Sequence, residues 1–501
     1  MSTLLIGHNV ISPTNILNSL LNAVQEMDFK KVVEMPYRIK IDEVNEKIQQ
    51  RNINNEKREA LIIQRDDLLT DLNKTKVIRQ HYLIITIEYI LDLANKFNWG
   101  ICKCHQSIYL YNGMFWSICN KSELILFFSK VCERMGIIWK AKYHVFHEDL
   151  YNQFMAVAHL SRPDQLKNTV LINLKNGTYE ISPFKQQLRP PERSDFLTYQ
   201  LSFHYNASLK APKFHEYLDT VLPDPDSQAI LAEYIGYLFI KPNALKLEKA
   251  LLLYGSGANG KSVFFEIVNA LLGKENVTNY SLQSLTNENG YSRAMLEHKL
   301  VNYSSEINGK MDTSIFKQLA SGEPVEARLP YGDPFILVDY AKLLFNCIEL
   351  PKDIEQTHAF FRRLILIGFN VTITADKQDK QLAKTIVENE LSGVFNWVLA
   401  GLQRLLLQKN FTNSKAVNDA LEDYMVQSDS IRTFLKDENY ESNPMDFIEL
   451  KKLYGIYRQY CSESGCHLCS NKTFSVRIRN TGIVMERKNH GMVVYVKKLS
   501  S

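Results

Sequence analysis

A glycine-rich segment near the middle of the chain has the residue types and spacing of a phosphate-binding loop. It reads Gly255-Ser256-Gly257-Ala258-Asn259-Gly260-Lys261-Ser262 and fits the pattern G-x-x-x-x-G-K-[ST]. Glycines let the backbone curl so that several N–H groups point at one anion. Lys261 would supply a positive charge for the β- and γ-phosphates, and the Ser262 hydroxyl could ligate Mg²⁺. We therefore expect these eight residues to bind ATP, with Mg²⁺ as the companion ion.

The segments on either side of this loop have the patterns that such a site requires. Residues 250–254 are apolar and predict a buried strand that leads into the loop, and residues 263–272 predict a helix that leaves it. The loop would then lie at the carboxyl edge of a parallel sheet, where α/β proteins bind their ligands.

Hydrolysis of a triphosphate also needs groups that hold Mg²⁺, orient water and stabilise charge. Glu306 ends a short apolar stretch about forty residues after the loop, and whether it supports Mg²⁺ together with Ser262 or polarises water stays open. Asn346 ends another apolar strand, where its amide could bond the γ-phosphate or orient the water. Arg362 and Arg363 place two cations directly before a third strand.

The composition is that of an ordinary globular protein. Of the 501 residues, 45% are hydrophobic and 23% charged, and the net charge of +4 means that any nucleic-acid surface must be local. No apolar stretch spans a bilayer and no signal peptide is apparent, so we expect no membrane partner and a cytoplasmic location. Eight irregularly spaced cysteines favour reduced thiols. Two groups of cysteine and histidine residues could be considered as zinc ligands (102, 104 and 105; 461, 466, 467 and 469). For both groups we favour ordinary packing of the side chains in the protein interior.

Changes in pattern predict four domains. Residues 1–76 are polar and helical, as in a helical hairpin or short coiled coil. Residues 77–245 form an α+β domain, with an apolar helix over 82–97 and hairpins at Asn112-Gly113 and Asn176-Gly177. Residues 246–415 form the α/β domain that carries the loop. Residues 416–501 contain three predicted helices (429–435, 446–462 and 470–480) and a hairpin around residues 489–491, which is a winged-helix pattern.

The last domain is locally basic. Between residues 471 and 498 there are seven basic residues and one acid, which is a net charge of +6 in a nearly neutral chain. Cations on the predicted recognition helix and wing make this domain a candidate for binding DNA; those assigned to the contact are Lys472, Arg477, Arg479, Arg487 and Lys488. Winged helices also bind proteins, so that alternative stays open.

The order of the motifs resembles the superfamily 3 helicases, most closely the helicase half of phage/plasmid and poxvirus-type primase-helicases. The loop is followed by a strand that ends in an acid, then by the family's Lys-x-Leu-x-x-Gly-[DE]-x-[IV]-x-[AG]-Arg segment at 317–328, a Lys-strand-Asn sensor at 342–346, and the Arg-Arg pair. The resemblance covers roughly residues 80 to 500. Two departures matter: Ser305 stands where many members have a second acid, and no primase domain is visible.

This resemblance implies a P-loop, AAA+-like superfamily 3 core and a hexameric ring with nucleotide between subunits. Arg362 or Arg363 would reach the neighbour's γ-phosphate in trans, the other being structural. The segment from Arg328 to Phe335 would form a pore hairpin that grips single-stranded DNA, with Lys317, Arg328 and Tyr331 as contacts. The alternative for the hairpin is a solvated tip without DNA contacts.

We therefore expect an ATP-dependent replicative DNA helicase of a virus, phage or other mobile element. It would act on single-stranded and forked DNA, with a separate primase or polymerase as a partner, at a bacterial or viral replication site. An alternative is an origin-binding initiator ATPase that does not unwind processively. A third interpretation is an AAA+-like ATPase that acts on protein.

Overall fold

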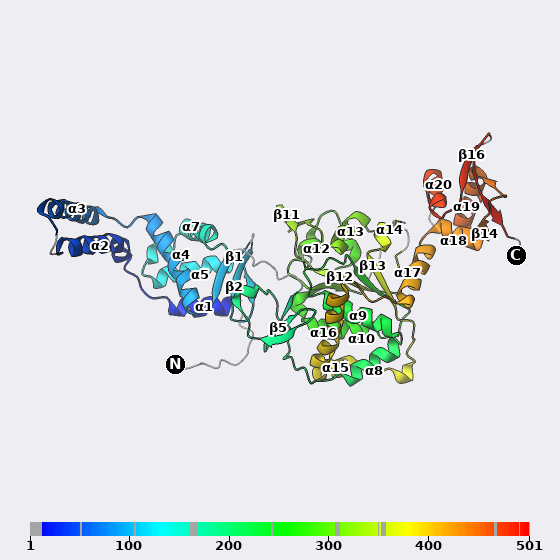
Figure 1. Cartoon of the computed structure of the whole chain (residues 1–501), viewed down its shortest axis with the longest axis horizontal. Coiled ribbons are helices and arrows are strands. Elements are labelled where there is room, and N and C mark those ends of the chain that lie inside the picture. Colours follow the sequence, from blue (N-terminus) through cyan, green and yellow to red (C-terminus); the bar gives the residue numbers. More distant parts are fainter. Residues whose placement is uncertain are drawn as a thin grey trace. The chain divides into compact units, whose positions relative to one another are not determined.

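The computed structural model describes residues 13–50, 53–104, 107–160, 169–241, 244–305, 311–348, 350–351, 357–464, 468–489 and 491–499 (Figure 1). The chain divides into two compact units, one made of residues 1–164 with 189–200 and the other of residues 165–188 with 201–501. Among the described helices, none is long and apolar enough to cross a membrane. The predicted domain boundaries, at 76/77, 245/246 and 415/416, stay predictions.

The first unit is mainly helical and carries one small antiparallel sheet. Its hydrophobic core joins α1, α4, α5 and α7 to one face of that sheet. Its helices are α1 (Pro13–Ala23), α2 (Phe29–Ile48), α3 (Asn55–Lys74), α4 (Arg79–Lys96), α5 (Lys121–Arg134), α6 (Ile138–Ala141) and α7 (His144–Val157). Its strands, in spatial order, are β1 (Gly100–Cys104), β2 (Ser107–Tyr111) and β3 (Trp116–Cys119). The predicted apolar helix over 82–97 is thus confirmed as α4.

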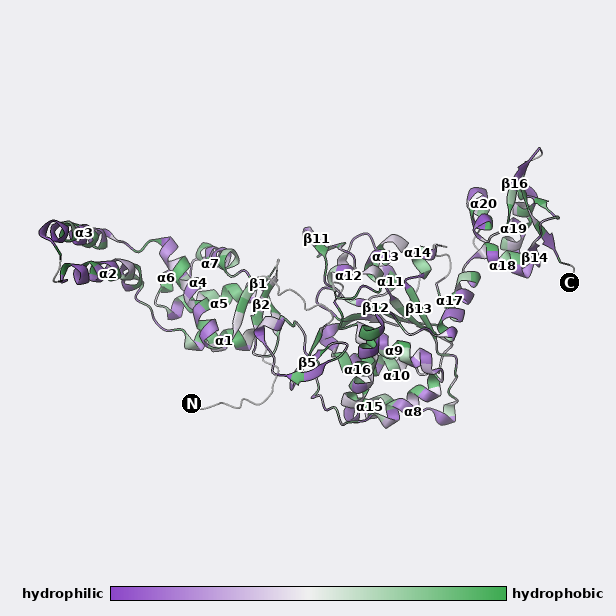
Figure 2. Cartoon of the chain, in the orientation of Figure 1, coloured by the Kyte–Doolittle hydropathy of each residue, from purple (hydrophilic) through white to green (hydrophobic). Residues whose placement is uncertain are grey.

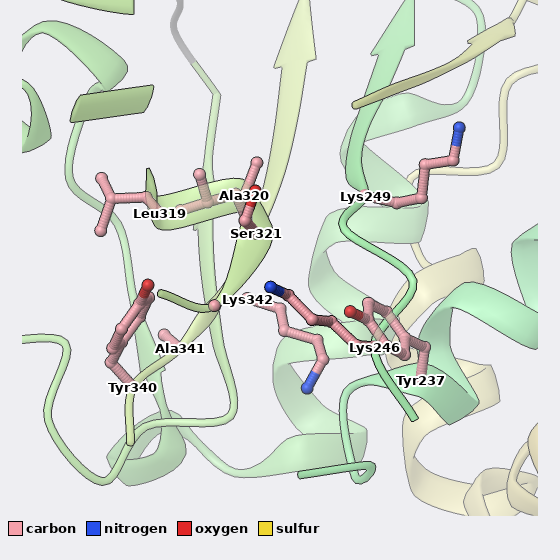
Figure 3. Close-up of a pocket in the computed structure, with 11 residues that line it drawn as sticks. Tyr237, Lys246, Lys249, Leu319, Ala320, Ser321, Tyr340, Ala341 and Lys342 are labelled. Carbon is pink, nitrogen blue, oxygen red and sulfur yellow. The ribbon is translucent and has the colours of Figure 1, made fainter. Parts of the chain in front are cut away.

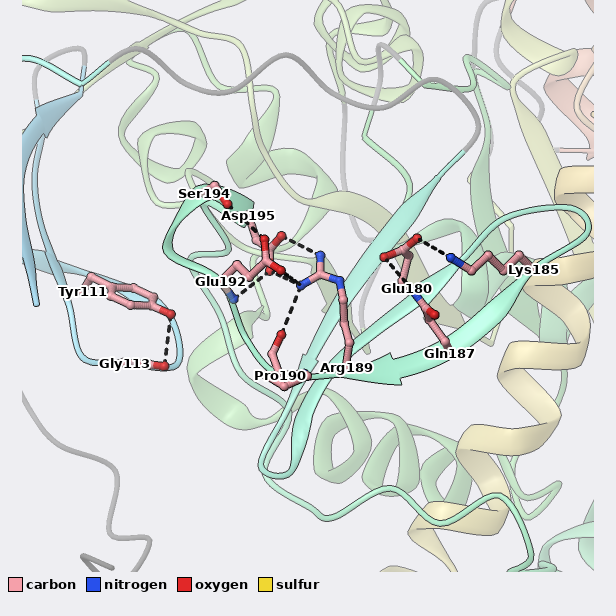
Figure 4. Close-up of polar contacts among 10 residues, drawn as sticks. All are labelled: Tyr111, Gly113, Glu180, Lys185, Gln187, Arg189, Pro190, Glu192, Ser194 and Asp195. Atoms are coloured by element: carbon pink, nitrogen blue, oxygen red, sulfur yellow. Dashed lines mark hydrogen bonds and ion pairs between the residues drawn. The ribbon is translucent and has the colours of Figure 1, made fainter. Parts of the chain in front are cut away.

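The predicted hairpin at Asn112-Gly113 is also confirmed. Strands β2 and β3 pair antiparallel, and the Asn112 side chain accepts hydrogen bonds from the N–H groups of Met114 and Phe115, both at 2.9 Å. The returning segment 189–200 is held to this sheet because the Trp116 indole donates to the Arg193 carbonyl at 2.9 Å. Arg189 also binds Asp195 with two hydrogen bonds of 2.6 and 2.9 Å (Figure 4).

Helices α2 and α3 form the N-terminal helical pair. Both begin with a side-chain cap, from Asp28 and Asn54 respectively. Ile41 and Val44 on α2 are buried, whereas α3 has no buried residue among those described. Figure 2 accordingly shows α3 as mostly hydrophilic and the strands β12 and β13 as hydrophobic.

The second unit is built around a five-stranded parallel sheet. The spatial order of its strands is β13-β7-β12-β9-β8, and every pairing is parallel. The strands are β7 (Ala250–Tyr254), β8 (Val277–Thr278), β9 (Val301–Ser304), β12 (Lys342–Cys347) and β13 (Leu364–Gly368). Because strands buried on both faces read as continuous apolar runs, the sequence predicts β7, β9, β12 and β13, whereas the two-residue β8 was not predicted. The protein is therefore α/β, as predicted.

Helices cover both faces of this sheet (Figure 1). Alternate residues of β7, β12 and β13 pack in one core with α13 (Thr313–Ser321), α14 (His358–Phe361) and α17 (Lys415–Gln427). The remaining helices of this part are α8 (Pro212–Val221), α9 (Pro225–Tyr237), α10 (Lys261–Leu272), α11 (Leu282–Leu285), α12 (Tyr291–Ala294), α15 (Leu382–Asn389) and α16 (Leu391–Gln408). A hairpin, β10 (Val325–Arg328) with β11 (Pro334–Leu337), follows α13.

A second small sheet opens this unit. Its order is β4-β5-β6, with β4 (Val170–Leu174), β5 (Gly177–Ile181) and β6 (Gln186–Arg189). Strands β4 and β5 pair antiparallel around residues 175–176, which confirms the second predicted hairpin. Next to it, Glu180 accepts from Gln187 at 3.3 Å and lies 3.9 Å from Lys185 (Figure 4).

A buried ion pair joins α9 to α16. Glu233 is fully buried, and its carboxylate accepts hydrogen bonds from Arg404 Nε at 2.5 Å and from the Thr412 backbone N–H at 2.8 Å. We expect Glu233→Gln to lower the free energy of unfolding by about 3 kcal/mol, because it breaks an ion pair whose carboxylate is fully buried and leaves Arg404 without an ion-pair partner among the described residues. Urea denaturation measures this change.

The matched control for this prediction is Glu388→Gln. Glu388 is exposed on α15 and lies 3.9 Å from Lys384, so its loss should cost less than about 0.5 kcal/mol. Equal effects of the two substitutions would show that the α9–α16 ion pair has no special role in stability.

The C-terminal part has its own core, formed by α18 (Ser430–Asp437), α19 (Leu450–Ser464) and α20 (Asn471–Asn480) with short strands. The strands are β14 (Tyr440–Ser442), β15 (Ile448–Glu449), β16 (Met485–Lys488), β17 (Gly491–Val494) and β18 (Val496–Lys498). They form a β15-β17-β16 sheet and a β14-β18 pair. The prediction of helix from residue 446 was wrong, because Ile448 and Glu449 pair with Val494 and Val493 as a strand.

Candidate functional site

The glycine-rich loop lies where the sequence predicts it, between β7 and α10 at the carboxyl edge of the parallel sheet. Gly255 and Gly260 adopt φ values of 152° and 87°. A Cβ on Gly255 would lie 2.3 Å from the Phe369 carbonyl oxygen, and one on Gly260 would lie 2.7 Å from Val221. Close backbone approach and positive φ therefore both require glycine at these two positions.

The backbone N–H groups of this loop are free to bind an anion. Within the part of the chain that the structure describes, those of residues 257–262 donate to no acceptor, because the first intrahelical bond of α10 starts at Phe264 N–H. Such N–H groups at a helix N-terminus attract phosphate. The Tyr217 hydroxyl donates to the Gly260 carbonyl at 2.9 Å, and this bond ties the loop to α8.

Lys261 is folded back over the loop. Its side chain is nearly buried, and its Nζ donates to the Gly255 carbonyl at 2.7 Å and to Asn259 Oδ1 at 3.0 Å. Asn259 in turn donates to the Phe369 carbonyl at 2.9 Å. Burial lowers the pKa of Lys261 from its ordinary value, while the Cys347 thiol opposes this shift. A bound polyphosphate would offer this amino group a stronger acceptor than a carbonyl.

The adjacent strands bring two further groups to this edge. Asn346 on β12 lies beside Leu253 of β7, and its Oδ1 accepts from the buried Tyr303 hydroxyl of β9 at 3.0 Å. This bond orients the amide so that Nδ2 remains available. The Ser262 hydroxyl is exposed and has no hydrogen bond among the described residues, so it suits a Mg²⁺ ligand. Glu306, predicted beside it, lies outside the described residues.

Arg362 and Arg363 lie at the opposite edge of the sheet. They precede β13, whose first residue pairs with Ala250 at the amino end of β7. At about 3.3 Å per residue, a five-residue strand separates them from the loop by about 15 Å. Arg363 is nearly buried and donates to Ser321 Oγ at 2.8 Å. Arg362 is half exposed and donates to Glu248 at 2.8 Å.

Three lysines surround a pocket at this same amino-terminal edge (Figure 3). Lys246 lies 3.2 Å from Glu248 and 3.9 Å from Glu323. Lys249 donates to the Arg362 carbonyl at 2.6 Å. Lys342 donates to the Ile240 carbonyl and lies 4.4 Å from the centre of the Tyr237 ring. Of these three lysines, Lys246 alone forms an ion pair with a carboxylate in the described part of the chain.

Burial lowers the pKa of Lys342 to about 8, although the nearby Asp339 opposes the shift. Between pH 8 and the ordinary lysine value, the unfolded chain binds more protons than the folded chain, so stability rises with pH across this window. We expect Lys342→Met to flatten this rise relative to the wild type, as measured by urea denaturation at pH 7, 8, 9 and 10. Parallel pH profiles of the two proteins would contradict the expectation.

The hairpin of β10 and β11 presents its tip to solvent. Tyr331 is fully exposed and has φ 60°, and Leu329 and Ile336 are also exposed. Arg328 Nε donates to the Gly332 carbonyl at 2.7 Å, which leaves its terminal nitrogens for other contacts. Lys317 lies on α13 and is partly buried.

The predicted basic residues of the C-terminal part separate into two groups. Lys472 and Arg479 are exposed on α20, and Arg487 is exposed on β16. Arg477 instead lies 3.7 Å from Asp429, the capping residue of α18. Lys488 lies 3.7 Å from the centre of the Phe447 ring. Lys472 and Arg479 therefore form the exposed cationic face of α20.

The described cysteines of the two weighed zinc groups can be placed in the fold. Cys102, Cys104 and Cys461 are buried, and no group of three potential ligands occurs among the residues that the structure describes. His105, Cys466 and His467 of the weighed zinc groups lie outside the described residues.

Sequence reasoning missed several groups around the loop. Tyr217, Tyr303 and Asn370 contribute polar atoms to this edge from α8, β9 and the segment after β13. None of the three belongs to a sequence motif, because each lies on a different element and only the fold places it near the loop. The tyrosines could be suspected only from their place in apolar segments, where a buried hydroxyl needs a partner.

The parallel sheet and its loop are consistent with the P-loop class of nucleotide-binding proteins. Residues 75–223 match the family described as D5 N terminal like, and residues 253–363 match a family of unknown function, DUF5906. These regions are typical of phage and viral primase-helicases, so the resemblance inferred from the motifs is confirmed. The two matched regions, together with a distant viral relative named as a putative helicase, agree with the resemblance to viral and phage helicases.

Individual relatives are distant. "Putative helicase 121R" of Invertebrate iridescent virus 3 is 23% identical over 342 residues, which are 58% of this chain and 35% of that protein. The chain thus matches about a third of that relative's length. Two apo structures of the C-terminal region of NrS-1 superpose with a TM-score of 0.42 and identities of 11% and 12%, over 82% and 70% of this chain and 98% and 77% of theirs.

Proposed function

We propose that this protein is an ATP- and Mg²⁺-dependent DNA helicase that serves replication of a virus, phage or mobile element. The observation that carries the proposal is the loop at the sheet's carboxyl edge, whose N–H groups donate to no acceptor among the described residues and over which Lys261 is held. The motif order and the two matched family regions point to the same class. Unwinding, the ring and the DNA contacts are parts of the proposal.

At the nucleotide, each group has a distinct role. The loop N–H groups and Lys261 bind the phosphates, and Asn346 orients the water or bonds the γ-phosphate. Ser262 and Glu306 would hold Mg²⁺, which would neutralise charge on the phosphate oxygens. Preorganised donors of this kind stabilise the charge that develops on the phosphate oxygens in the transition state. They therefore contribute to hydrolysis as well as to binding of the nucleotide.

Six copies in a ring would place the cationic edge of one subunit against the loop of the next. Arg362 cannot reach its own loop across the sheet, but it is exposed enough to reach a neighbour's. Arg363 is committed to Ser321, Ala359 and Glu248. Of the two candidates, the proposal therefore assigns the trans-acting arginine to Arg362 and a structural role to Arg363.

The exposed hairpin tip is the proposed contact with single-stranded DNA, with Tyr331 stacking on a base and Arg328 near a phosphate. Lys317 is kept as a supporting cation. We expect Tyr331→Ala to weaken binding of single-stranded DNA about tenfold, since stacking on one aromatic ring contributes about 1–3 kcal/mol. Fluorescence anisotropy with a labelled oligonucleotide measures the dissociation constant.

The control for this variant is Tyr331→Phe, which keeps the ring and the tip's backbone. It should bind DNA like the wild type. If Tyr331→Ala also binds like the wild type, the tip is a solvated turn and does not contact DNA.

For the C-terminal part, a winged helix is proposed, with α20 as recognition helix and the β16–β17 hairpin as wing. The exposed Lys472 and Arg479 on α20 and Arg487 on the wing would contact the duplex. This cationic face also favours the second candidate, an initiator ATPase that binds an origin without processive unwinding. Lys488 and Arg477 have intramolecular contacts, so their part is secondary.

Strand displacement separates the two candidates. A helicase should release the labelled strand of a forked duplex in an ATP-dependent reaction, and a blunt duplex should be a poor substrate. An initiator should bind duplex DNA and hydrolyse ATP without releasing the strand. Failure to displace any strand, with hydrolysis intact, would overturn the helicase proposal in favour of the initiator.

A further inference from the structure

A second cavity, of about 170 Å³, lies beside the glycine-rich loop. Its walls come from the α8–α9 connection (Leu222), the end of β13 and the following segment (Gly368, Asn370, Val371), and the start of α17 (Ala416, Val417). A cavity of about 150 Å³ holds a benzene ring. This cavity is therefore large enough for a flat aromatic ring, and it is open to solvent on one side.

The residues that line the cavity are adjacent to the loop in sequence or in contact with it. Tyr254, which lines the cavity, directly precedes Gly255. Val221, also in the lining, lies 2.7 Å from a Cβ built on Gly260. The Phe369 N–H, between two lining residues, donates to the Tyr254 carbonyl at 2.8 Å. A ligand with phosphates on the loop thus has its next group at the cavity mouth.

The lining is mostly apolar but holds four polar side chains, of which Asp224 and Ser227 are hydrogen-bonded to each other at 2.5 Å and Asn370 and Tyr254 lie close together. A Cβ built on Gly368 would lie 2.9 Å from Asn370 Nδ2 and 3.0 Å from the Tyr254 hydroxyl. Within the described residues, neither of these side-chain groups has a hydrogen-bond partner. Pockets for flat ligands combine apolar walls with a few such groups, which fix the ligand's orientation.

We propose that this cavity binds the base of the nucleotide and that Asn370 selects adenine. The proposal rests on the proposed function. An asparagine amide offers a donor and an acceptor side by side, which match N7 and the 6-amino group of adenine. Guanine presents two acceptors at the same edge, so one half of the amide would stay unpaired. The cavity therefore prefers an adenine nucleotide over a guanine nucleotide.

Calorimetric titration of the full chain with three Mg²⁺-bound probes tests this proposal. The probes are AMP-PNP, GMP-PNP and inorganic tripolyphosphate, which has no base. The wild type should bind AMP-PNP about tenfold or more tightly than either other probe, the discrimination expected of one paired amide. Asn370→Ala should bring the AMP-PNP and GMP-PNP affinities together and leave tripolyphosphate binding unchanged.

Ala416→Trp fills the cavity from its rim and should reduce the affinity for AMP-PNP to that for tripolyphosphate. Asn389→Ala removes an exposed asparagine of α15 away from the cavity and should behave like the wild type. Asn370 is exposed, so its variant keeps the test decisive even if the tryptophan destabilises the fold.

An unchanged probe preference in Asn370→Ala, or an unchanged AMP-PNP affinity in Ala416→Trp, overturns the base pocket while leaving phosphate binding intact. Failure of the wild type to bind any of the three probes overturns the proposed function as well. The two failures are therefore distinguishable.

Discussion

Substitution of Lys261 by alanine is expected to reduce ATP hydrolysis by about 10²–10³-fold, the usual cost of losing one preorganised charge-stabilising group. The Lys261 amino group lies within hydrogen-bond distance of the Gly255 carbonyl and Asn259. It is therefore already placed at the loop when phosphate arrives. Steady-state release of phosphate, measured with saturating Mg²⁺ and single-stranded DNA, reports the change.

Lys274→Ala is the matched control for this substitution. Lys274 follows the same helix, α10, and is exposed at its far end, so its removal takes away a nearby positive charge without touching the loop. It should hydrolyse ATP at the wild-type rate. Full hydrolysis by Lys261→Ala would mean that the glycine-rich loop is not the catalytic nucleotide site.

Arg362→Ala is expected to lower the turnover number by 10³-fold or more, which is the scale of losing an arginine that stabilises the transition state of phosphoryl transfer. The fold should survive, because the Arg362 guanidinium is half exposed and its one ion pair within the described residues is with Glu248. Arg363→Ala should instead lower the melting temperature, since its nearly buried guanidinium holds Ser321 and Ala359. Turnover and melting temperature together separate the two roles.

Mixing experiments test whether Arg362 acts on a neighbour. Arg362→Ala chains keep an intact loop, and Lys261→Ala chains keep an intact arginine. If the arginine acts in trans, mixed rings of these two inactive variants contain some complete sites and regain part of the hydrolysis. If every mixture is inactive although particle images show assembled rings, Arg362 does not act on the neighbouring subunit. It would then act within its own subunit or have no role in hydrolysis.

The sequence predicted the parts of the fold that follow from local pattern. Buried parallel strands are continuous apolar runs, so β7, β12 and β13 were found from residue type alone. Asn-Gly and Gly-rich turns marked the hairpins of the first half, and the loop motif located the nucleotide edge. Motif order also predicted the relationship to viral and phage primase-helicases.

Other features depend on distant contacts, which no local pattern shows. The local pattern at Ile448 predicts a helix, but the residue forms a strand because it pairs with Val494, nearly fifty residues later. The different environments of Arg362 and Arg363 arise from Glu248 and Ser321, which only the fold brings to them. The cavity at Asn370 likewise joins four separated segments.

Hydrolysis of ATP by the full chain, with and without single-stranded DNA, tests the central claim most directly. We expect turnover that requires Mg²⁺ and that rises when single-stranded DNA is added, because the proposed motor couples its nucleotide loop to a DNA-gripping hairpin. Absence of Mg²⁺-dependent hydrolysis at any DNA concentration would contradict the claim that the loop from Gly255 to Ser262 drives a motor.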